Sequence, residues 1–200
     1  INKGVSGLSA YPFFIKQKHM PCLLNTGRKL PCKSAFGGIK NVYFLNYGEI
    51  KNTIQDLTTC EFTMTLEDFA QKWLQFEVKG SSSLETAVTS SRDNGTTFYT
   101  QTLNLTLTYL DACTQKELQV IAVARPYVVV EDYYGNFFLC GAENGMEVTG
   151  GTVVTGAAAG DLSGFTLVFE GMEETAPLFL KEAPSPVSDT TIYPTGNPTP

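Results

Sequence analysis

Few side chains in this sequence have the types and spacing that could do acid–base or nucleophilic chemistry. His19 is the only histidine, and no cluster of Cys, Asp or Glu lies near it along the chain. The adjacent carboxylates Glu131-Asp132 and Glu173-Glu174 would point to opposite faces of a strand, which favours a solvated surface over an acid and base pair. No set of nucleophile, base and oxyanion donors is visible. We therefore expect no catalytic, metal-binding or cofactor-binding residue, and a protein that is not an enzyme.

Other residues with chemical potential also favour structural interpretations. The glycines from Gly150 to Gly164 are not followed by Gly-Lys-Ser or Gly-Lys-Thr, so they predict turns and not a phosphate-binding loop. Trp73 is either an interface anchor or, as we favour, a core residue. Irregular cysteine spacing argues against a zinc site and against a disulfide framework, so free thiols are expected, with a Cys22–Cys32 disulfide as the alternative. The cysteines are Cys22, Cys32, Cys60, Cys113 and Cys140.

Charge is strongly polarised along the chain. Residues 1–51 carry eight Lys or Arg and one acid, a net charge of +7, whereas residues 52–200 carry six and nineteen, a net charge of −13. The segment from Pro126 to Leu180 holds eight acids and no Lys or Arg. Such a segment repels phosphate backbones and is not expected to grip nucleic acid.

The elements that must position these residues are mainly strands. Thr, Val, Tyr, Phe and Gly are plentiful and helix formers are scarce. Apolar and polar residues alternate in Leu74–Val78 and in Leu103–Tyr109, which predicts two half-buried strands. Further strands are expected at residues 41–47, 60–65, 127–130, 137–140, 146–155 and 165–169, with an edge strand at 176–180.

A hairpin and a helix complete the expected body. Asn94-Gly95 is typical of a tight hairpin turn, and its Ser- and Thr-rich flanks from Ser81 to Gln101 predict a hairpin that projects beyond its own core and needs a partner. A capping box at Thr114 and Glu117 predicts a helix over 115–124, and a weaker signal suggests one or two helical turns over 66–72.

The expected fold is a β-sandwich or barrel of antiparallel strands with one flanking helix, a long projecting hairpin and extended terminal arms. We divide the chain into a basic N-terminal arm over residues 1–39, a β-rich domain over 40–181 and a Pro-rich C-terminal tail over 182–200 that will not fold alone. No apolar stretch reaches the roughly 20 residues that a membrane-spanning helix needs. No membrane insertion is expected.

This order of elements resembles that of tail-tube and tail-ring proteins of tailed bacteriophages, over about Lys40 to Leu180. The segment GTVVTGAAAGDLSGFTLVFEGMEETAPLFL resembles the terminal strands of such proteins in crAss-like and related Bacteroidetes phages. The resemblance implies a structural virion protein that forms a ring in the tail, as a tube subunit or as an adaptor or barrel ring. Its partners would be copies of itself, neighbouring tail or portal proteins, and phage DNA passing non-specifically through the lumen. It would be assembled in the host bacterial cytoplasm.

The resemblance also implies roles for particular residues. In that family the long hairpin reaches the neighbouring ring, so the hairpin tip is a candidate inter-subunit contact: Arg92, Asp93, Asn94 and Gly95. An acidic wall would let DNA phosphates slide, which makes four acids candidates for the lumen: Glu131, Asp132, Glu143 and Glu147. The basic N-terminal arm would then meet acidic faces of adjacent subunits.

Two other classes of function remain as alternatives. One is a β-sandwich that binds a receptor or glycan at the tail tip, for which Trp73 is the only large indole platform and no compact acidic calcium-binding loop is visible. The other is an enzyme on a β-barrel, which lacks a credible set of catalytic residues. We rank tail structure first, the binding module second and the enzyme third.

Overall fold

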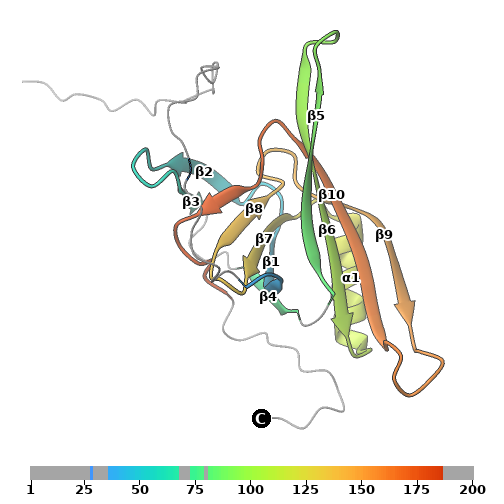
Figure 1. Cartoon of the computed structure of the whole chain (residues 1–200). Helices are drawn as coiled ribbons and strands as arrows, with labels where there is room; N and C mark the ends of the chain where they lie inside the picture. The colour runs from blue at the N-terminus through green and yellow to red at the C-terminus, as the bar shows by residue number, and fades with distance from the viewer. Residues whose placement is uncertain (1–27, 29–35, 68–72, 79–80, 187–200) are drawn as a thin grey trace, which may run out of the picture. The chain divides into compact units, whose positions relative to one another are not determined.

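The computed structural model describes residue 28 and residues 36–67, 73–78 and 81–186 (Figure 1). The chain separates into two compact units, Ile1–Ser34 and Ala35–Pro200. Everything below concerns the second unit. The predicted basic arm, with His19, Cys22 and Cys32, lies outside the described residues, as do residues 187–200 of the predicted tail and residues 68–72 of the weak helical signal.

The second unit is built from strands and one helix among its described residues. In chain order the elements are β1 (Ile39–Leu45), β2 (Ile50–Gln55), β3 (Phe62–Leu66), β4 (Leu74–Glu77), β5 (Ser83–Ser91), β6 (Thr96–Thr108), α1 (Ala112–Val123), β7 (Tyr127–Asp132), β8 (Phe137–Cys140), β9 (Glu147–Val154), β10 (Gly164–Glu173) and β11 (Leu178–Leu180). The prediction of a mainly β fold with one flanking helix is confirmed.

The strands form two sheets. The seven-stranded sheet has the order β2-β3-β11-β8-β7-β1-β4, and the four-stranded sheet has the order β5-β6-β10-β9. Neighbouring strands are antiparallel except β3 and β11, which pair in parallel at Phe62 and Leu180. The sheets pack as a sandwich and do not close into a barrel, so the sandwich is the correct one of the two expected architectures.

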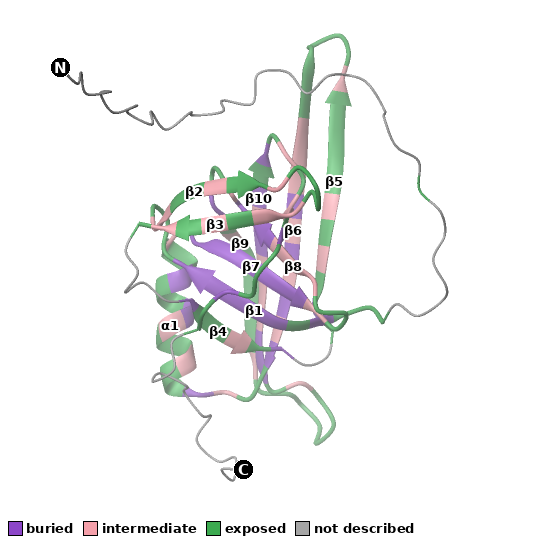
Figure 2. Cartoon of the chain, turned by 90° about the vertical axis from the view of Figure 1, so that its left-hand side faces the viewer, coloured by how far each residue is buried: buried purple, intermediate pink, exposed green. Residues whose placement is uncertain are grey.

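The main core lies between the two sheets and α1. Leu103, Leu105 and Leu107 of β6 all reach it because alternate residues of a strand share one face. Figure 2 shows these buried positions as purple segments on the facing strands. Burial of one such side chain stabilises the fold by about 1.5–3 kcal/mol. The core also contains Phe44, Val128, Val130, Phe165 and Phe169 of the strands and Leu118 and Ile121 of α1.

A second core lies on the other face of the seven-stranded sheet. Trp73 is 1% exposed there and packs with Tyr43, Val129, Leu139 and Leu180. The prediction of a core tryptophan is therefore confirmed. Because Trp73 is buried, it offers no platform to an external ligand.

Several expectations about individual elements were wrong. The helix begins at Ala112, and its N-cap is Asp111, whose carboxylate accepts hydrogen bonds from the backbone N–H groups of Cys113 and Thr114. Thr114 therefore lies inside the first turn and does not cap the helix. Tyr109 was expected in the core but is 57% exposed, since the chain turns there with a φ of 69°.

Two further corrections concern the sheets. The strand at Leu178–Leu180 is not an edge strand, because it lies between β3 and β8. The sequence pattern also missed β2, whose side chains are all exposed or half-buried and so carry little apolar periodicity. The predicted C-terminal tail starts inside the packed body: Pro184 is buried, and the carbonyl of Ser185 accepts a hydrogen bond from the Trp73 N–H at 3.2 Å.

Candidate functional site

The outward face of the four-stranded sheet is polar. Residues of β6 that alternate with the core leucines point away from the core, and the pairing register places their neighbours on β5, β10 and β9 on the same face. Thr152 and Thr166 are joined there by a hydrogen bond of 2.6 Å between their hydroxyls. This outward face, which we call the hydroxyl face, comprises Ser83, Glu85, Ala87, Thr100, Thr102, Asn104, Thr106, Thr108, Glu147, Thr152, Thr166, Val168, Glu170 and Met172.

One row of the hydroxyl face concentrates its negative charge. Glu85 of β5 pairs with Thr102 of β6, Thr102 pairs with Glu170 of β10, and Glu170 pairs with Glu147 of β9. The four strands contain no Lys, Arg or His along their whole length. The face therefore offers hydroxyls and the carboxylates of Glu85 and Glu170 to a polyanion, with no strand residue that could grip phosphate. The charge of Glu147 is paired with Arg125, which lies outside these strands, at 3.1 Å.

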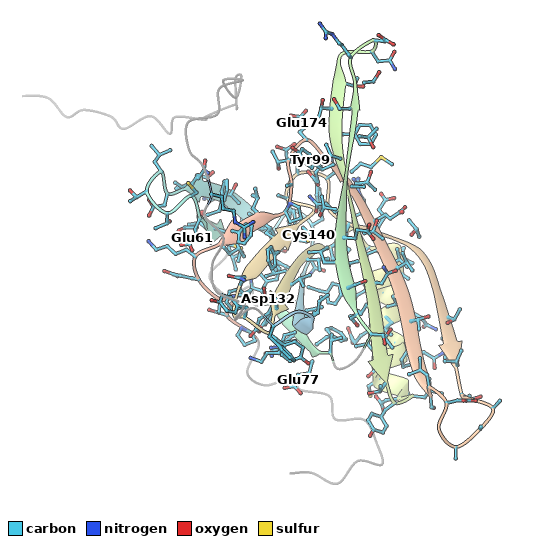
Figure 3. All side chains as sticks on the ribbon, in the orientation of Figure 1. Glu61, Glu77, Tyr99, Asp132, Cys140 and Glu174 are labelled. Carbon is cyan, nitrogen blue, oxygen red and sulfur yellow. The ribbon has the colours of Figure 1, made fainter. Side chains whose placement is uncertain are left out.

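The β5–β6 hairpin extends beyond the rest of the sheet, as Figure 1 shows. β5 pairs with β6 along its whole length, from Ser83 to Ser91. β10 pairs with β6 only from Tyr99 onward, so the part of the hairpin between Tyr99 and the tip has no partner in β10. Figure 3 shows Tyr99 at the place where the hairpin leaves the sheet. The predicted tip, Arg92 to Gly95, forms the turn, with a φ of 63° at Gly95 and a hydrogen bond from its N–H to the Arg92 carbonyl. Whether the tip contacts another subunit stays a prediction.

A buried polar cluster joins the base of the hairpin to two connecting segments, the turn between β8 and β9 and the connection between β10 and β11. Gln101 of β6 accepts a hydrogen bond from the Gly141 N–H at 3.0 Å and donates one to the Thr175 carbonyl at 3.1 Å. The carboxylate of Glu173, which pairs across the strands with Tyr99, accepts hydrogen bonds from the backbone N–H of Asn144 at 2.8 Å and of Glu143 at 3.2 Å. Because these groups are buried, losing a partner would carry a desolvation cost.

The sequence contains one signal for this cluster. Gln101 occupies a core-facing position in the alternating pattern of β6, two residues before Leu103. A polar residue at a core position indicates a buried hydrogen-bonding partner, but the pattern cannot say which partner. Glu173 shows no such signal, because Glu173-Glu174 predicts a solvated surface. That prediction is wrong for Glu173, which is 2% exposed.

The turn between β8 and β9 is clamped from outside by Arg125. Its guanidinium donates to the Asn144 carbonyl at 2.6 Å, forms an ion pair with Glu147 at 3.1 Å and lies over the Tyr47 ring at 5.4 Å. The Tyr47 hydroxyl donates to the Glu143 carbonyl at 2.7 Å. The turn is therefore held from several sides, and its shape is well defined.

The four predicted lumen acids do not lie together. Only Glu147 belongs to the hydroxyl face, and Glu143 is an exposed residue of the β8–β9 turn. Asp132 ends β7 and fixes the next turn, because its carboxylate accepts hydrogen bonds from the backbone N–H groups of Tyr134 and Asn136. Sequence reasoning therefore missed Glu85 and Glu170, whose common row depends on strand pairing. The lumen assignment stays a prediction.

Glu131 is 7% exposed and belongs to the seven-stranded sheet. Its carboxylate accepts hydrogen bonds from Asn41 Nδ2 at 2.6 Å, Tyr43 Oη at 2.7 Å and Lys40 Nζ at 2.9 Å. Burial raises the pKa of Glu131, but these hydrogen bonds and the Lys40 charge outweigh burial and leave the pKa below its ordinary value. Its charge is therefore neutralised within the chain and is not offered to a passing phosphate.

Both edges of the four-stranded sheet are strands without a described neighbour on their outer side. β5 is the first strand of the order and β9 the last, with nine and eight residues respectively. Edge strands present unpaired backbone N–H and C=O groups that can pair with another chain. The sheet can thus be extended at either end.

Metal and membrane features are not found in the described part of the chain. There, no group of three or more His, Cys, Asp or Glu is placed to hold a metal ion. No helix of the described residues is long and apolar enough to cross a membrane. Cys60, Cys113 and Cys140 are free thiols. No protein family, curated protein or solved structure matches the chain.

Proposed function

We propose that this chain is a structural virion protein that forms a ring around the DNA channel of a bacteriophage tail, as a tube subunit or as an adaptor or barrel ring. The observation that carries the proposal is the hydroxyl face, because it is broad, the described residues leave it uncovered and its strands lack any cation. Lining a channel with this face would let DNA pass without being held.

The two sheet edges support ring formation. A ring needs two different surfaces on each subunit that fit one another, since a head-to-tail contact closes only if it is heterologous. β5 and β9 are two such edges of one sheet, and pairing β5 of one copy with β9 of the next would continue the hydroxyl face around the ring. The hairpin would then project from the ring and reach a neighbouring ring or tail protein.

The glycan-binding alternative receives no support from a specific observation. The indole platform that could have favoured it is Trp73, which is buried in the second core. The described residues also hold no acidic group arranged for a metal ion such as calcium.

The first experiment is the mass of the purified full chain in solution, together with electron microscopy of the same sample. We expect closed rings or stacked tubes with a central channel. A chain that stays monomeric at the highest soluble concentration, with or without other tail proteins, would contradict the proposal. A glycan-array screen of that monomer would then test the binding-module alternative.

The lumen assignment is tested by reversing charge on the acidic row. We expect the double variant Glu85→Lys/Glu170→Lys to form rings that retain double-stranded DNA at low salt, whereas wild-type rings do not, because added cations near phosphates strengthen binding. The matched control is Glu61→Lys/Glu67→Lys, which changes the same charge at the two residues that flank β3 of the other sheet. Equal DNA retention by both double variants would place the hydroxyl face outside the lumen.

A further inference from the structure

The two open edges of the four-stranded sheet are offset along the strands. Figure 1 shows β5 and β9 as the outer strands of this sheet. β5 lies beside one end of β6, whereas β10 and β9 lie beside the other, so only three rows of paired residues cross all four strands. A second copy placed in line with the first would pair β5 with β9 over these rows alone. They run from Ser83 to Gly150, from Leu84 to Val148 and from Glu85 to Glu147.

Each edge also leaves one valine exposed. Val88 of β5 is 60% exposed, and Val153 of β9 is 61% exposed. Both lie on the inner face of the sheet, opposite to the hydroxyl face, because Val88 alternates in step with Leu84 and Val153 pairs with the buried Phe165. A β-branched side chain on an open edge gains contacts when a second strand places an apolar side chain opposite it.

A shift of the second copy by four residues along the strands matches the two edges. β9 runs opposite to β5 within the sheet, so a copy related by rotation around a channel presents an antiparallel edge. Every residue of β9 except the bulged Thr149 then lies opposite a residue of β5. The inner-face pairs include Leu84 with Val153 and Val88 with Val148, and the outward pairs include Glu85 with Thr152 and Thr89 with Glu147.

Other shifts match the edges less well. An odd shift sets the inner face of one copy beside the hydroxyl face of the next. Without a shift Glu85 faces Glu147, and like charges directly opposite one another are unfavourable. A shift of two residues leaves Val153 beyond the start of β5, and a shift of six sets Val88 opposite Gly151. A shift of eight sets the two valines opposite each other but leaves Glu147 beyond the end of β5.

We propose that β5 of one copy and β9 of the next pair in this one register, shifted by four residues. This inference rests on the ring of the proposed function and specifies the contact that closes it. Because each copy contributes four strands, the stagger is one residue per strand. A closed barrel with that stagger has strands tilted by about 36°. The end of the hairpin beyond Thr89 stays free to reach a neighbouring ring.

Cysteine cross-linking in the full chain tests the register. Glu85→Cys is combined with a second cysteine on the outward face of β9, and within one chain the two lie roughly 14 Å apart, beyond the reach of a disulfide. The second substitution is Thr152→Cys for the proposed register, and Glu147→Cys, Gly150→Cys or Val154→Cys for shifts of no, two or six residues.

Mild oxidation of the variant with Thr152→Cys is expected to give a ladder of cross-linked multimers at least about tenfold faster than oxidation of the other three. Wild type oxidised in parallel reports on cross-links from the five natural cysteines. Equal rates in all four variants, a fastest rate with another partner, or no cross-linking above wild type overturns the register.

A second measurement removes one of the apolar pairs. Val88→Lys is expected to raise at least about fivefold the concentration at which half of the chain is assembled, because Val148 of the next copy loses its partner. The matched control is Ile54→Lys, since Ile54 is 58% exposed on β2, an edge strand of the other sheet. Equal effects of the two variants on light scattering would contradict the proposed contact.

Electron microscopy of the cross-linked samples distinguishes failure of this inference from failure of the proposed function. Rings whose copies cross-link fastest in another register would overturn the register and leave the tail assignment standing. Open filaments that cross-link in the proposed register but enclose no channel would support the edge pairing and contradict the tail assignment.

Discussion

At the scale of single residues, Glu131 shows how a carboxylate acquires a structural role. Its three hydrogen-bond donors, Lys40, Asn41 and Tyr43, all belong to β1, whereas Glu131 itself belongs to β7. The network therefore joins two adjacent strands, the fifth and sixth of the seven-stranded sheet. Burial of Tyr43 and its hydrogen bond to Glu131 also raise the pKa of the Tyr43 hydroxyl.

We expect Glu131→Ala to lower the free energy of unfolding at neutral pH by about 2–3 kcal/mol, because Asn41 and Tyr43 stay buried without their acceptor. The depressed pKa of Glu131 means that its contribution is present above the ordinary value of 4.5 and is lost as pH falls through the folded-state pKa. The difference between variant and wild type should therefore shrink in acid. Urea unfolding at several pH values measures it.

The control for this variant is Glu67→Ala. Glu67 forms an exposed ion pair with Lys51 at 3.6 Å, and such pairs contribute at most about 1 kcal/mol. If the two variants destabilise the protein equally at neutral pH, the buried network around Glu131 contributes nothing beyond a surface charge.

At the scale of elements, the ladder between β6 and β10 depends on a close backbone approach. Gly164 pairs with Thr108, and a Cβ at Gly164 would collide with the backbone carbonyl of Leu107. Only glycine lets the strands approach there. Gly150 of β9 has open space where its Cβ would lie.

We expect Gly164→Ala to lower the free energy of unfolding by about 1–3 kcal/mol, because the strands must shift to relieve the collision. Gly150→Ala should change it by less than about 1 kcal/mol. Chemical unfolding of both variants compares them directly. An unchanged free energy of unfolding in Gly164→Ala would show that the β6 and β10 backbones can move apart at this end without loss of stability.

The helix supplies a second test at this scale. Asp111→Ala is expected to cost about 1 kcal/mol, because the N–H groups of Cys113 and Thr114 lose their acceptor. Glu117→Ala, which removes the other half of the capping box expected from the sequence, should stay within about 0.5 kcal/mol of wild type. Thermal unfolding measures both losses of stability. A larger loss for Glu117→Ala than for Asp111→Ala would support the capping box expected from the sequence.

At the scale of the whole molecule, the C-terminal segment helps to complete the second core. Pro184 is buried, and residues 73 and 186 form a parallel bridge. These residues join the end of the body to the strand that follows β3 in the chain. The boundary between domain and tail expected after residue 181 therefore passes through packed residues.

We expect a chain that ends at Pro186 to be more stable than a chain that ends at Glu182, because only the longer chain keeps the contacts of residues 183–186 with Trp73. Both should remain folded, and both should assemble less well than the full chain if the tail contacts other subunits. Urea unfolding and light scattering separate the two effects. Equal stability of the truncated chains would contradict the structural role of residues 183–186.

How much of the candidate site could be predicted depended on whether a signal was local. The hairpin tip at Arg92–Gly95 was predictable because Asn94-Gly95 favours the turn through the conformation of those residues alone. The acidic row of Glu85, Glu170 and Glu147 was not, because its members meet only through the pairing of strands far apart in the chain.

The sequence by itself determined the β class, most of the strands, the helix and the projecting hairpin, since alternation and turn residues act over a few neighbouring positions. Tertiary structure alone decided which sheet each strand joins, including the place of β11 between β3 and β8. It also decided which acids are buried: Glu131 finds Asn41 at a separation of 90 residues, and Glu173 finds Asn144 at 29. The local sequence around a carboxylate does not indicate which groups will donate hydrogen bonds to it, because burial and hydrogen bonding arise only when distant segments pack.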